Sequence, residues 1–172
     1  SSIKMIEIMK KVLLLVGFIV SSALTINAQD ISENAIGLRL GSDDGFGGEI
    51  SYQRALGGNN RLEIDLGLRN SNNYDGFKAT GLYQWLWNIE GGFNWYAGVG
   101  AGLASYSGNN NNNNNNDDYS ETFVFAAGDI GIEYNFPNTP ILLSLDYRPE
   151  FGFGDRYNDF GNDIAFGIRY QF

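Results

Sequence analysis

Apolar and polar positions alternate strictly over the last nine residues of the chain. Every second residue from position 164 to position 172 is isoleucine, phenylalanine or tyrosine, and the residues between them are alanine, glycine, arginine and glutamine. Successive side chains of a β-strand point to opposite faces. The segment therefore predicts a strand with one wholly apolar face, and the chain ends on an aromatic residue of that face.

The same alternation recurs in seven earlier segments and predicts an all-β chain. Clusters of glycine, asparagine, aspartate and proline separate the segments, which is typical of turns between paired strands. The expected strands span residues 35–41, 46–56, 61–69, 77–87, 94–104, 121–134, 141–151 and 164–172. We therefore predict eight antiparallel strands in an up-and-down β-barrel.

Two of these segments break the alternation. Leu82 and Leu86 fall on the polar face of segment 77–87, and Phe123 and Phe125 fall on the polar face near the start of segment 121–134. A β-bulge would explain the first irregularity. A one-residue shift of register in either segment would invert which of its side chains face outward.

Composition agrees with a single exported β domain. The 172 residues include 23 glycines and 15% aromatic residues, which favour sheet and tight turns over helix. The net charge of −9 disfavours nucleic acid as a partner, because phosphate binding needs clustered lysine and arginine. There is no cysteine, so an exported domain of this kind must be held together without disulfides.

The amino-terminal region has the pattern of a targeting segment. Lys10 and Lys11 precede an apolar run at 12–20, and small or polar residues then lead to Ala28. Nine apolar residues are too few to cross a bilayer as a helix, which takes about 20. We predict that residues 1–28 form an amino-terminal extension and cleavable signal peptide, with cleavage after Ala28, and that residues 29–172 form the barrel domain.

Two low-complexity features need a structural interpretation. Gly98, Gly100 and Gly102 resemble a dinucleotide-binding fingerprint, but they lie inside an alternating strand rather than at a strand-to-helix turn. We expect them on the inner wall, where they leave room for large side chains. Eight consecutive asparagines at 109–116 predict a disordered polar loop at 105–120 that lies outside any membrane.

Alternation alone leaves two barrel types open, because a soluble lipocalin-like barrel also alternates, with its apolar face inward. Three features favour lipid on the outside. Compact turns at 57–60, 88–92 and 135–140 contrast with the long loop at 105–120, and most strands approach the length that a tilted strand needs to cross a bilayer. Aromatic residues also gather near strand ends on the apolar face, namely Tyr52, Trp87, Trp95, Tyr134, Tyr147, Tyr170 and Phe172.

With lipid outside, the polar face must fill the barrel, and its charges must pair there. The residues expected to form ion pairs in the interior are Arg39, Glu49, Glu63, Asp65, Asp146, Arg148 and Arg169. We expect Arg169 to neutralise Asp146 or Glu63. Arg39 and Arg148 are expected among the acidic residues, which include Glu150. An eight-stranded barrel is only wide enough for side chains, which argues against a wide pore.

Together, the signal segment, the eight alternating segments and the terminal Phe172 resemble the OmpA- and OmpX-like eight-stranded barrels of Gram-negative outer membranes. The resemblance covers residues 35–172. It implies an outer-membrane location, lipid contacts and a role for Phe172 as the signal that the barrel-assembly machinery recognises. Full-length OmpA also carries a peptidoglycan-binding domain, which we do not expect here.

The absence of histidine disfavours an enzyme, because the outer-membrane lipases, acyl transferases and proteases of similar architecture use a histidine. Catalysis through carboxylates alone, such as Asp129 and Asp146, is the remaining enzymatic alternative. We expect no cofactor and no metal, and a monomer with a structural or surface-interaction role. Small-channel and soluble-carrier roles are less favoured.

The main alternative is an adhesin-like or cation-binding surface protein that acts through acidic external loops. No loop has the spacing of an EF-hand, and solvated loop charge explains the same composition. The acidic residues expected in these loops are Asp43, Asp44, Asp75, Asp117, Asp118, Glu121, Asp155 and Asp159.

Overall fold

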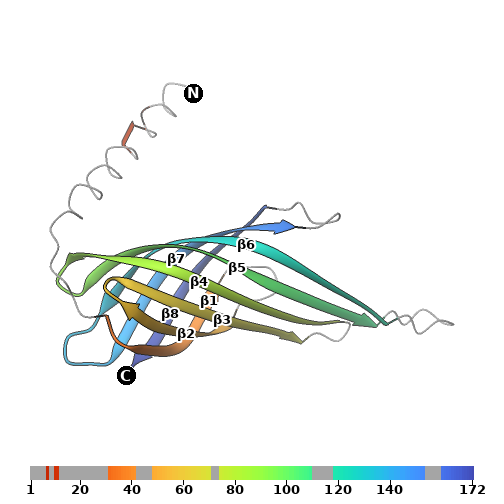
Figure 1. Ribbon diagram of the computed structural model, residues 1–172, viewed down its shortest axis with the longest axis horizontal. Coiled ribbons are helices and arrows are strands. Elements are labelled where there is room, and N and C mark those ends of the chain that lie inside the picture. Colours follow the sequence, from red (N-terminus) through yellow and green to blue (C-terminus); the bar gives the residue numbers. More distant parts are fainter. Residues whose placement is uncertain are drawn as a thin grey trace.

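The computed structural model describes residues 7, 10, 11, 31–41, 48–70, 74–109, 118–153 and 160–172. Within them are eight strands: β1 (Asn34–Gly41), β2 (Gly48–Gly57), β3 (Asn60–Asn70), β4 (Tyr74–Glu90), β5 (Phe93–Asn109), β6 (Asp118–Asn135), β7 (Ile141–Phe153) and β8 (Phe160–Gln171). Each strand pairs antiparallel with the next, and β8 pairs with β1, so the sheet closes into a barrel (Figure 1). The predicted eight-stranded up-and-down barrel is confirmed.

The signal-peptide prediction falls almost wholly outside the described residues, so cleavage after Ala28 stays a prediction. Among the residues that are described, no helix has the length and apolar character needed to cross a membrane.

Three central strands are longer than the alternation predicted. β4 and β5 each contain 17 residues and β6 contains 18. The expected loop at 105–120 is therefore wrong at both ends, because the β5–β6 ladder continues to the pair Asn109↔Asp118. Most of the asparagine tract lies outside the described residues. β7 pairs with β6 only as far as Val124, whereas β4 stays paired with β5 as far as Gly108. The β5–β6 hairpin, with β4 beside it, therefore projects beyond β7 (Figure 1).

The last strand closes the barrel by pairing with the first. β8 pairs with β1 from Ala35↔Gln171 to Gly41↔Ala165. Beyond the ladder, Asn34 and Phe172 exchange two backbone hydrogen bonds with N···O distances of 3.1 and 2.9 Å. The carboxyl-terminal residue thus lies at the seam between the first and last strands.

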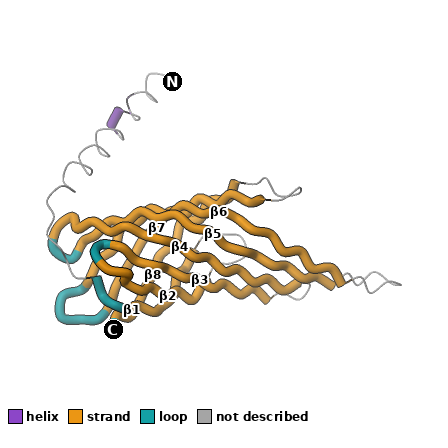
Figure 2. Tube along the Cα trace, viewed as in Figure 1, coloured by secondary structure: helices purple, strands orange, loops and turns teal. Residues whose placement is uncertain are grey.

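Compact turns lie at the end of the barrel where the chain terminates (Figure 2). Gly57 and Gly58 join β2 to β3 with φ values of 103° and 60°, and Gly91 joins β4 to β5 with φ of 53°. Asn138 in the β6–β7 connection has φ of 63°. Glycine and asparagine adopt this left-handed region most readily, which allows such short connections.

The irregular alternation in β4 and β6 comes neither from a bulge within the segment nor from a shift of register. β4 pairs without irregularity from Tyr74 to Asn88, and a shift occurs only between Asn88 and Glu90 at its end. Leu82 and Phe125 point into the barrel, with 0% and 1% of their surface exposed. The interior is therefore not uniformly polar, and apolar residues on the inward face need no local distortion.

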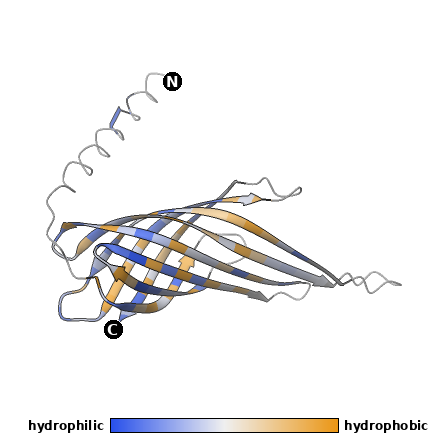
Figure 3. Ribbon diagram, viewed as in Figure 1, coloured by the Kyte–Doolittle hydropathy of each residue, from blue (hydrophilic) through white to orange (hydrophobic). Residues whose placement is uncertain are grey.

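The outer wall is apolar along every strand, so orange and blue positions alternate along the ribbon (Figure 3). Leu68, Val99 and Ile50 expose 73%, 58% and 54% of their surface. Aromatic residues concentrate near the compact turns, where the Trp87 and Trp95 rings stack with centroids 4.2 Å apart. Tyr147 lies in the middle of β7 rather than near its end, and its hydroxyl donates to Asn162 at 2.6 Å.

Candidate functional site

The candidate site is the barrel interior, where buried charged side chains come from seven of the eight described strands, all except β5. Arg39 on β1 lies at its centre and is 1% exposed. Its guanidinium donates two hydrogen bonds to Asp146, with Nε to Oδ2 at 2.9 Å, and further bonds to Asp163 at 2.6 Å and Glu49 at 3.3 Å. One arginine thus holds three carboxylates that come from β7, β8 and β2.

Glu63 on β3 is the most completely satisfied carboxylate of the interior. It accepts hydrogen bonds from Arg169 at 2.6 Å, Arg148 at 3.1 Å, Gln53 at 2.8 Å and Gln84 at 2.9 Å. These donors come from β8, β7, β2 and β4. Glu63 therefore ties together strands on opposite sides of the barrel.

Arg148 is differently placed, because it is surrounded by carboxylates yet bonds to few of them. Its NH2 group lies 2.8 Å from Asp65, and other guanidinium nitrogens lie 3.7 Å from Glu49 and 4.0 Å from Asp129. Its Nε and NH1 groups have no hydrogen-bond partner among the described residues. The contact of Arg148 with Asp65, Glu49 and Asp129 is therefore mainly one of charge.

Two further ion pairs flank this network along the barrel axis. Toward the compact turns, Arg61 pairs with Glu133 at 3.0 Å, and its guanidinium lies 5.2 Å from the centre of the Tyr96 ring. Toward the opposite end, Lys78 pairs with Glu150 at 2.7 Å. Each of these cations has one carboxylate as its main partner.

All seven residues predicted for interior ion pairs lie inside the barrel and are buried. Two carboxylates were expected as partners of Arg169. Glu63 forms an ion pair with Arg169, whereas Asp146 forms one with Arg39. Gly167 on β8 makes room for Arg169, because a Cβ there would lie 2.6 Å from its NH1 nitrogen.

The sequence analysis missed two members of the network. Arg61 lies at the start of an expected strand and was not assigned to a face, and Asp163 lies one residue before one. Asp163 has the same parity as Arg169, so a strand started earlier, as β8 is at Phe160, would have placed it inside. The alternation therefore includes Asp163, but the expected strand began one residue too late to contain it.

A small apolar cluster lines the interior on β4, β5 and β6. It consists of Leu82, Ala104, Phe125 and Ala127, with Tyr106 and Phe123 packed against it. The rings of Tyr106 and Phe123 are stacked with centroids 5.8 Å apart. This cluster fills part of the lumen where a uniformly polar interior was expected.

Inner-wall glycines make room for large neighbours, as expected. A Cβ at Gly102 would overlap the ring of Phe125, with Cε2 at 2.8 Å, and a Cβ at Gly131 would lie 2.5 Å from the Tyr96 hydroxyl. Gly98, Gly100 and Gly102 all lie within β5. A Cβ at Gly98 would lie 2.9 Å from Cγ of Gln84, and one at Gly100 would lie 2.8 Å from Cα of Leu82, so Gly102 alone of the three makes room for a ring while the other two allow close approach of β4.

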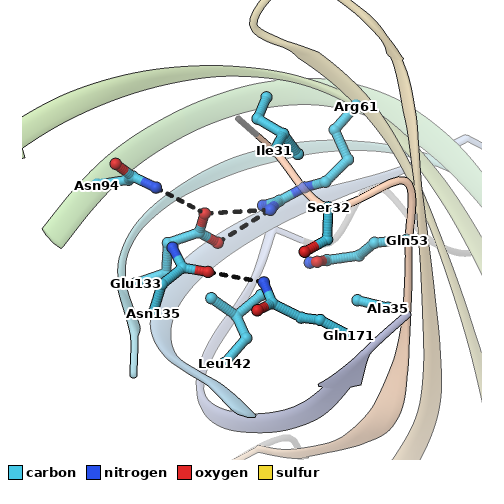
Figure 4. Close-up of a pocket in the computed structure, with 10 residues that line it drawn as sticks. All are labelled: Ile31, Ser32, Ala35, Gln53, Arg61, Asn94, Glu133, Asn135, Leu142 and Gln171. Atoms are coloured by element: carbon cyan, nitrogen blue, oxygen red, sulfur yellow. Dashed lines mark hydrogen bonds and ion pairs between the residues drawn. The ribbon is translucent and has the colours of Figure 1, made fainter. Parts of the chain in front are cut away.

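A shallow pocket opens at the end of the barrel near the compact turns (Figure 4). Its empty space of about 280 Å³ includes open solvent, so the pocket is a shallow depression rather than an enclosed cavity. Glu133 bridges Arg61 and Asn94 on one side, and Gln171 donates to Asn135 at 2.7 Å on another. Residues 31 and 32 line the same pocket and narrow its mouth.

The chemistry of the interior is that of paired charges. Within the described residues, no group of three or more histidine, cysteine, aspartate or glutamate side chains is arranged to hold a metal ion. Asp129, one of the two carboxylates considered for catalysis, accepts a hydrogen bond from Gln84 and lies 4.0 Å from Arg148. Asp146, the other, is held by Arg39.

The sequence matches no protein-family model and no curated protein. The fold resembles neisserial surface protein A, with a TM-score of 0.57, 15% identity, and coverage of 81% of this chain and 94% of that one. The amino-terminal β-barrel domain of Pseudomonas aeruginosa OprF gives a TM-score of 0.57 at 13% identity, with 81% of this chain and 100% of that one covered. The attachment invasion locus protein Ail of Yersinia pestis gives a TM-score of 0.53 at 15% identity, with 82% of this chain and 97% of that one covered. The likeness to small outer-membrane barrels is thus confirmed for the fold.

Proposed function

We propose that this protein is an outer-membrane barrel that crosses the bilayer, is filled by ion pairs, and serves a structural or surface-interaction role. One observation carries the proposal: the distribution of polarity is the reverse of that in a soluble protein. Among the described residues twelve charged side chains are buried, while large apolar side chains cover the outer wall.

This reversal has a large energetic consequence. A soluble monomer rarely exposes a contiguous apolar patch larger than a few hundred Å², whereas here apolar residues of all eight strands face outward. Lipid removes that cost and leaves the charged face enclosed. The soluble lipocalin-like alternative would need an apolar interior, and most of the buried residues that the structure describes are charged or polar.

The enclosed charges also argue against a wide pore or an enzyme. Arg39, Arg148 and Arg169 are among the largest fully buried side chains, and they lie across the lumen. The chain has no histidine, and the carboxylates Asp129 and Asp146 contact partners within the network. We therefore propose no catalytic role and no cofactor.

The projecting β5–β6 hairpin supports a surface-interaction role as a second candidate. Its outward residues beyond the apolar wall are Ser105, Ser107 and Thr122, and Thr122 donates a hydrogen bond to Ser105 at 3.2 Å. A polar outer surface suits a position in water above the bilayer. Ail, a protein of similar fold, is described as an attachment invasion locus protein.

Membrane insertion is tested by placing a charge on the outer wall. Ile64 is 40% exposed in the middle of that wall, and arginine near the bilayer midplane costs about 2–4 kcal/mol in barrels of this kind. We expect Ile64→Arg to reduce the folded, heat-modifiable protein recovered with outer membranes. Thr122→Arg, on an outward residue of the projecting hairpin, should behave as wild type. Wild-type protein that stays folded and single in buffer without detergent would overturn membrane insertion.

The assembly role of Phe172 is a separate proposal. Its ring is 61% exposed and stacks on Tyr170 at 6.1 Å, while its backbone holds the seam with Asn34. Because the side chain contributes little to the folded barrel, Phe172→Ala should lower the amount assembled several-fold without lowering the unfolding midpoint of the protein that does assemble. Phe136→Ala, an exposed aromatic in a turn, is the control. Equal yields from both variants would contradict the assembly role.

A gene deletion separates the two candidate roles. Loss of envelope integrity, measured as detergent sensitivity, supports the structural role. An intact envelope with reduced attachment to surfaces supports the interaction role, particularly if shortening the β5–β6 hairpin reproduces that loss.

A further inference from the structure

The centre of the lumen contains more carboxylates than cations. Arg61 and Glu133 pair with each other, as do Lys78 and Glu150. The other buried charged residues that the structure describes are three arginines and six carboxylates: Arg39, Arg148, Arg169, Glu49, Glu63, Asp65, Asp129, Asp146 and Asp163. Uncompensated charge is costly inside a closed wall.

This surplus is not shared equally, as two neighbours on β3 demonstrate. Glu63 and Asp65 are both fully buried on the inward face. Glu63 accepts hydrogen bonds from two arginines and two glutamines, whereas Asp65 has only the Arg148 ion pair and the Ser51 hydroxyl beside it, and neither of its oxygens makes a well-formed hydrogen bond to a described residue. The closest cation to Asp65 is Arg148, at 2.8 Å, and that arginine already bonds to Glu63.

A second unsatisfied oxygen lies beside Asp65. Thr80 on β4 is its direct partner in the β3–β4 ladder, and directly opposed residues carry neighbouring side chains. Thr80 is 2% exposed, and its hydroxyl has no hydrogen-bond partner among the described residues. Two buried side chains with oxygen ligands, one of them charged, thus lie next to each other, and neither has its full complement of hydrogen bonds among the described residues.

The charged groups around Asp65 come from several strands and do not remove its excess negative charge. They are Glu49 on β2, Glu63 on β3, Lys78 on β4, Asp129 on β6, Arg148 on β7 and Arg169 on β8. Lys78 is engaged by Glu150, and Arg169 is engaged by Glu63, Ser51 and Ser144.

We propose that Asp65 and Thr80 form a site inside the barrel for one small positive charge, supplied by an alkali cation or by a proton. Carboxylate and hydroxyl oxygens are suitable ligands for a hard cation, and a proton would give Asp65 a donor in place of a charge. The site depends only on the closed interior. It can therefore be tested with the folded full chain in detergent or, should membrane insertion fail, in buffer.

The test measures unfolding by urea at constant ionic strength. At pH 8, Na⁺ or K⁺ replaces N-methylglucamine, which is too bulky to enter the lumen. Once the cation concentration exceeds the dissociation constant, each tenfold increase should lower the unfolding constant about tenfold, because only the folded state binds the cation.

A second series in N-methylglucamine lowers the pH from 8.5 to 5.5. If a proton fills the site, stability should rise as the pH falls, since the folded state then binds more protons than the unfolded state.

Asp65→Asn should abolish whichever dependence the wild type shows, and in N-methylglucamine at pH 8 it should unfold at no lower urea concentration than the wild type. If Asp65→Asn fails to fold, Thr80→Val provides the test instead. It should weaken the dependence of unfolding on the alkali-cation concentration. The control is Glu133→Gln, which removes an equally buried carboxylate that Arg61 already neutralises. This variant should lose stability but keep the dependence.

An alkali response that depends on Asp65 supports the site with a metal cation, and a pH response alone that depends on Asp65 supports it with a proton. The proposal is overturned if the wild type responds to neither, if Asp65→Asn responds in parallel with the wild type, or if Glu133→Gln loses the response equally. Loss in Glu133→Gln would indicate general screening of the lumen. None of these outcomes bears on membrane insertion.

Discussion

At the scale of single residues, arginine provides most of the cohesion of the barrel interior. A guanidinium has five N–H donors in a fixed planar fork, so one side chain can hold several carboxylates at once. Arg39 does so with Asp146, Asp163 and Glu49, which lie on three other strands. A lysine at this position has one compact charge and would not reproduce the paired bonds to Asp146.

The contribution of Arg39 can be measured against an exposed arginine in the same protein. Arg39→Leu would leave three buried carboxylates without their cation, and we expect a loss of about 3–5 kcal/mol in the free energy of unfolding. Arg54→Leu removes the pair with Glu33, whose side chains are 51% and 71% exposed, and should change stability by less than about 1 kcal/mol. Urea unfolding of both variants in detergent measures the difference. Equal midpoints would show that the network contributes no more than a surface pair.

At the scale of strands, the three longest, β4, β5 and β6, combine small residues on the inner wall with large ones on the neighbouring strand. Gly131 on β6 leaves space for Tyr96 on β5, and Gly102 on β5 leaves space for Phe125 on β6. The two strands thereby place two aromatic rings inside a narrow barrel. This fit depends on register, because a one-residue shift would turn every one of these residues to the other wall.

The fit between β5 and β6 predicts opposite outcomes for two glycine substitutions. Gly131→Ala would place a Cβ 2.5 Å from the Tyr96 hydroxyl and 2.8 Å from the Leu145 carbonyl oxygen, so we expect a loss of about 1–3 kcal/mol. Gly81→Ala, on the outer wall, would have its nearest neighbour 4.0 Å away and should be neutral or slightly stabilising. Thermal loss of the heat-modifiable band measures both. A destabilised Gly81→Ala with a normal Gly131→Ala would mean that the inner and outer faces of these strands are exchanged.

The sequence predicted the strands and their faces well, because period-two alternation is a property that each strand carries by itself. It predicted the strand ends poorly, because pairing beyond the apolar wall depends on the partner strand. Ser105, Ser107 and Ser120 fall in the expected loop and are nevertheless part of the β5–β6 ladder. The sequence could not predict which ions pair, since alternation puts Arg39, Arg169 and Asp146 on one face without showing which of them are in contact.

At the scale of the whole molecule, the barrel has two unlike ends. Compact turns, the carboxyl terminus and the shallow pocket share one end (Figure 2). The β5–β6 hairpin projects from the other, beyond the last β6–β7 pair at Val124. Barrels of the outer membrane have short turns on the periplasmic side and longer loops outside. We therefore expect the compact turns to face the periplasm and the β5–β6 hairpin to face the exterior.

Epitope tags inserted at the two ends test this orientation directly. A tag between residues 113 and 114 should be labelled by antibody on intact cells, because the β5–β6 hairpin carries it away from the outer wall. A tag between Gly91 and Gly92 lies in the compact β4–β5 turn and should be labelled only after the outer membrane is permeabilised. Flow cytometry with and without permeabilisation measures both, and the heat-modifiable band shows that each tagged protein has folded. Labelling of the Gly91 tag on intact cells, with the other tag protected, would mean that the barrel is inserted in the opposite direction.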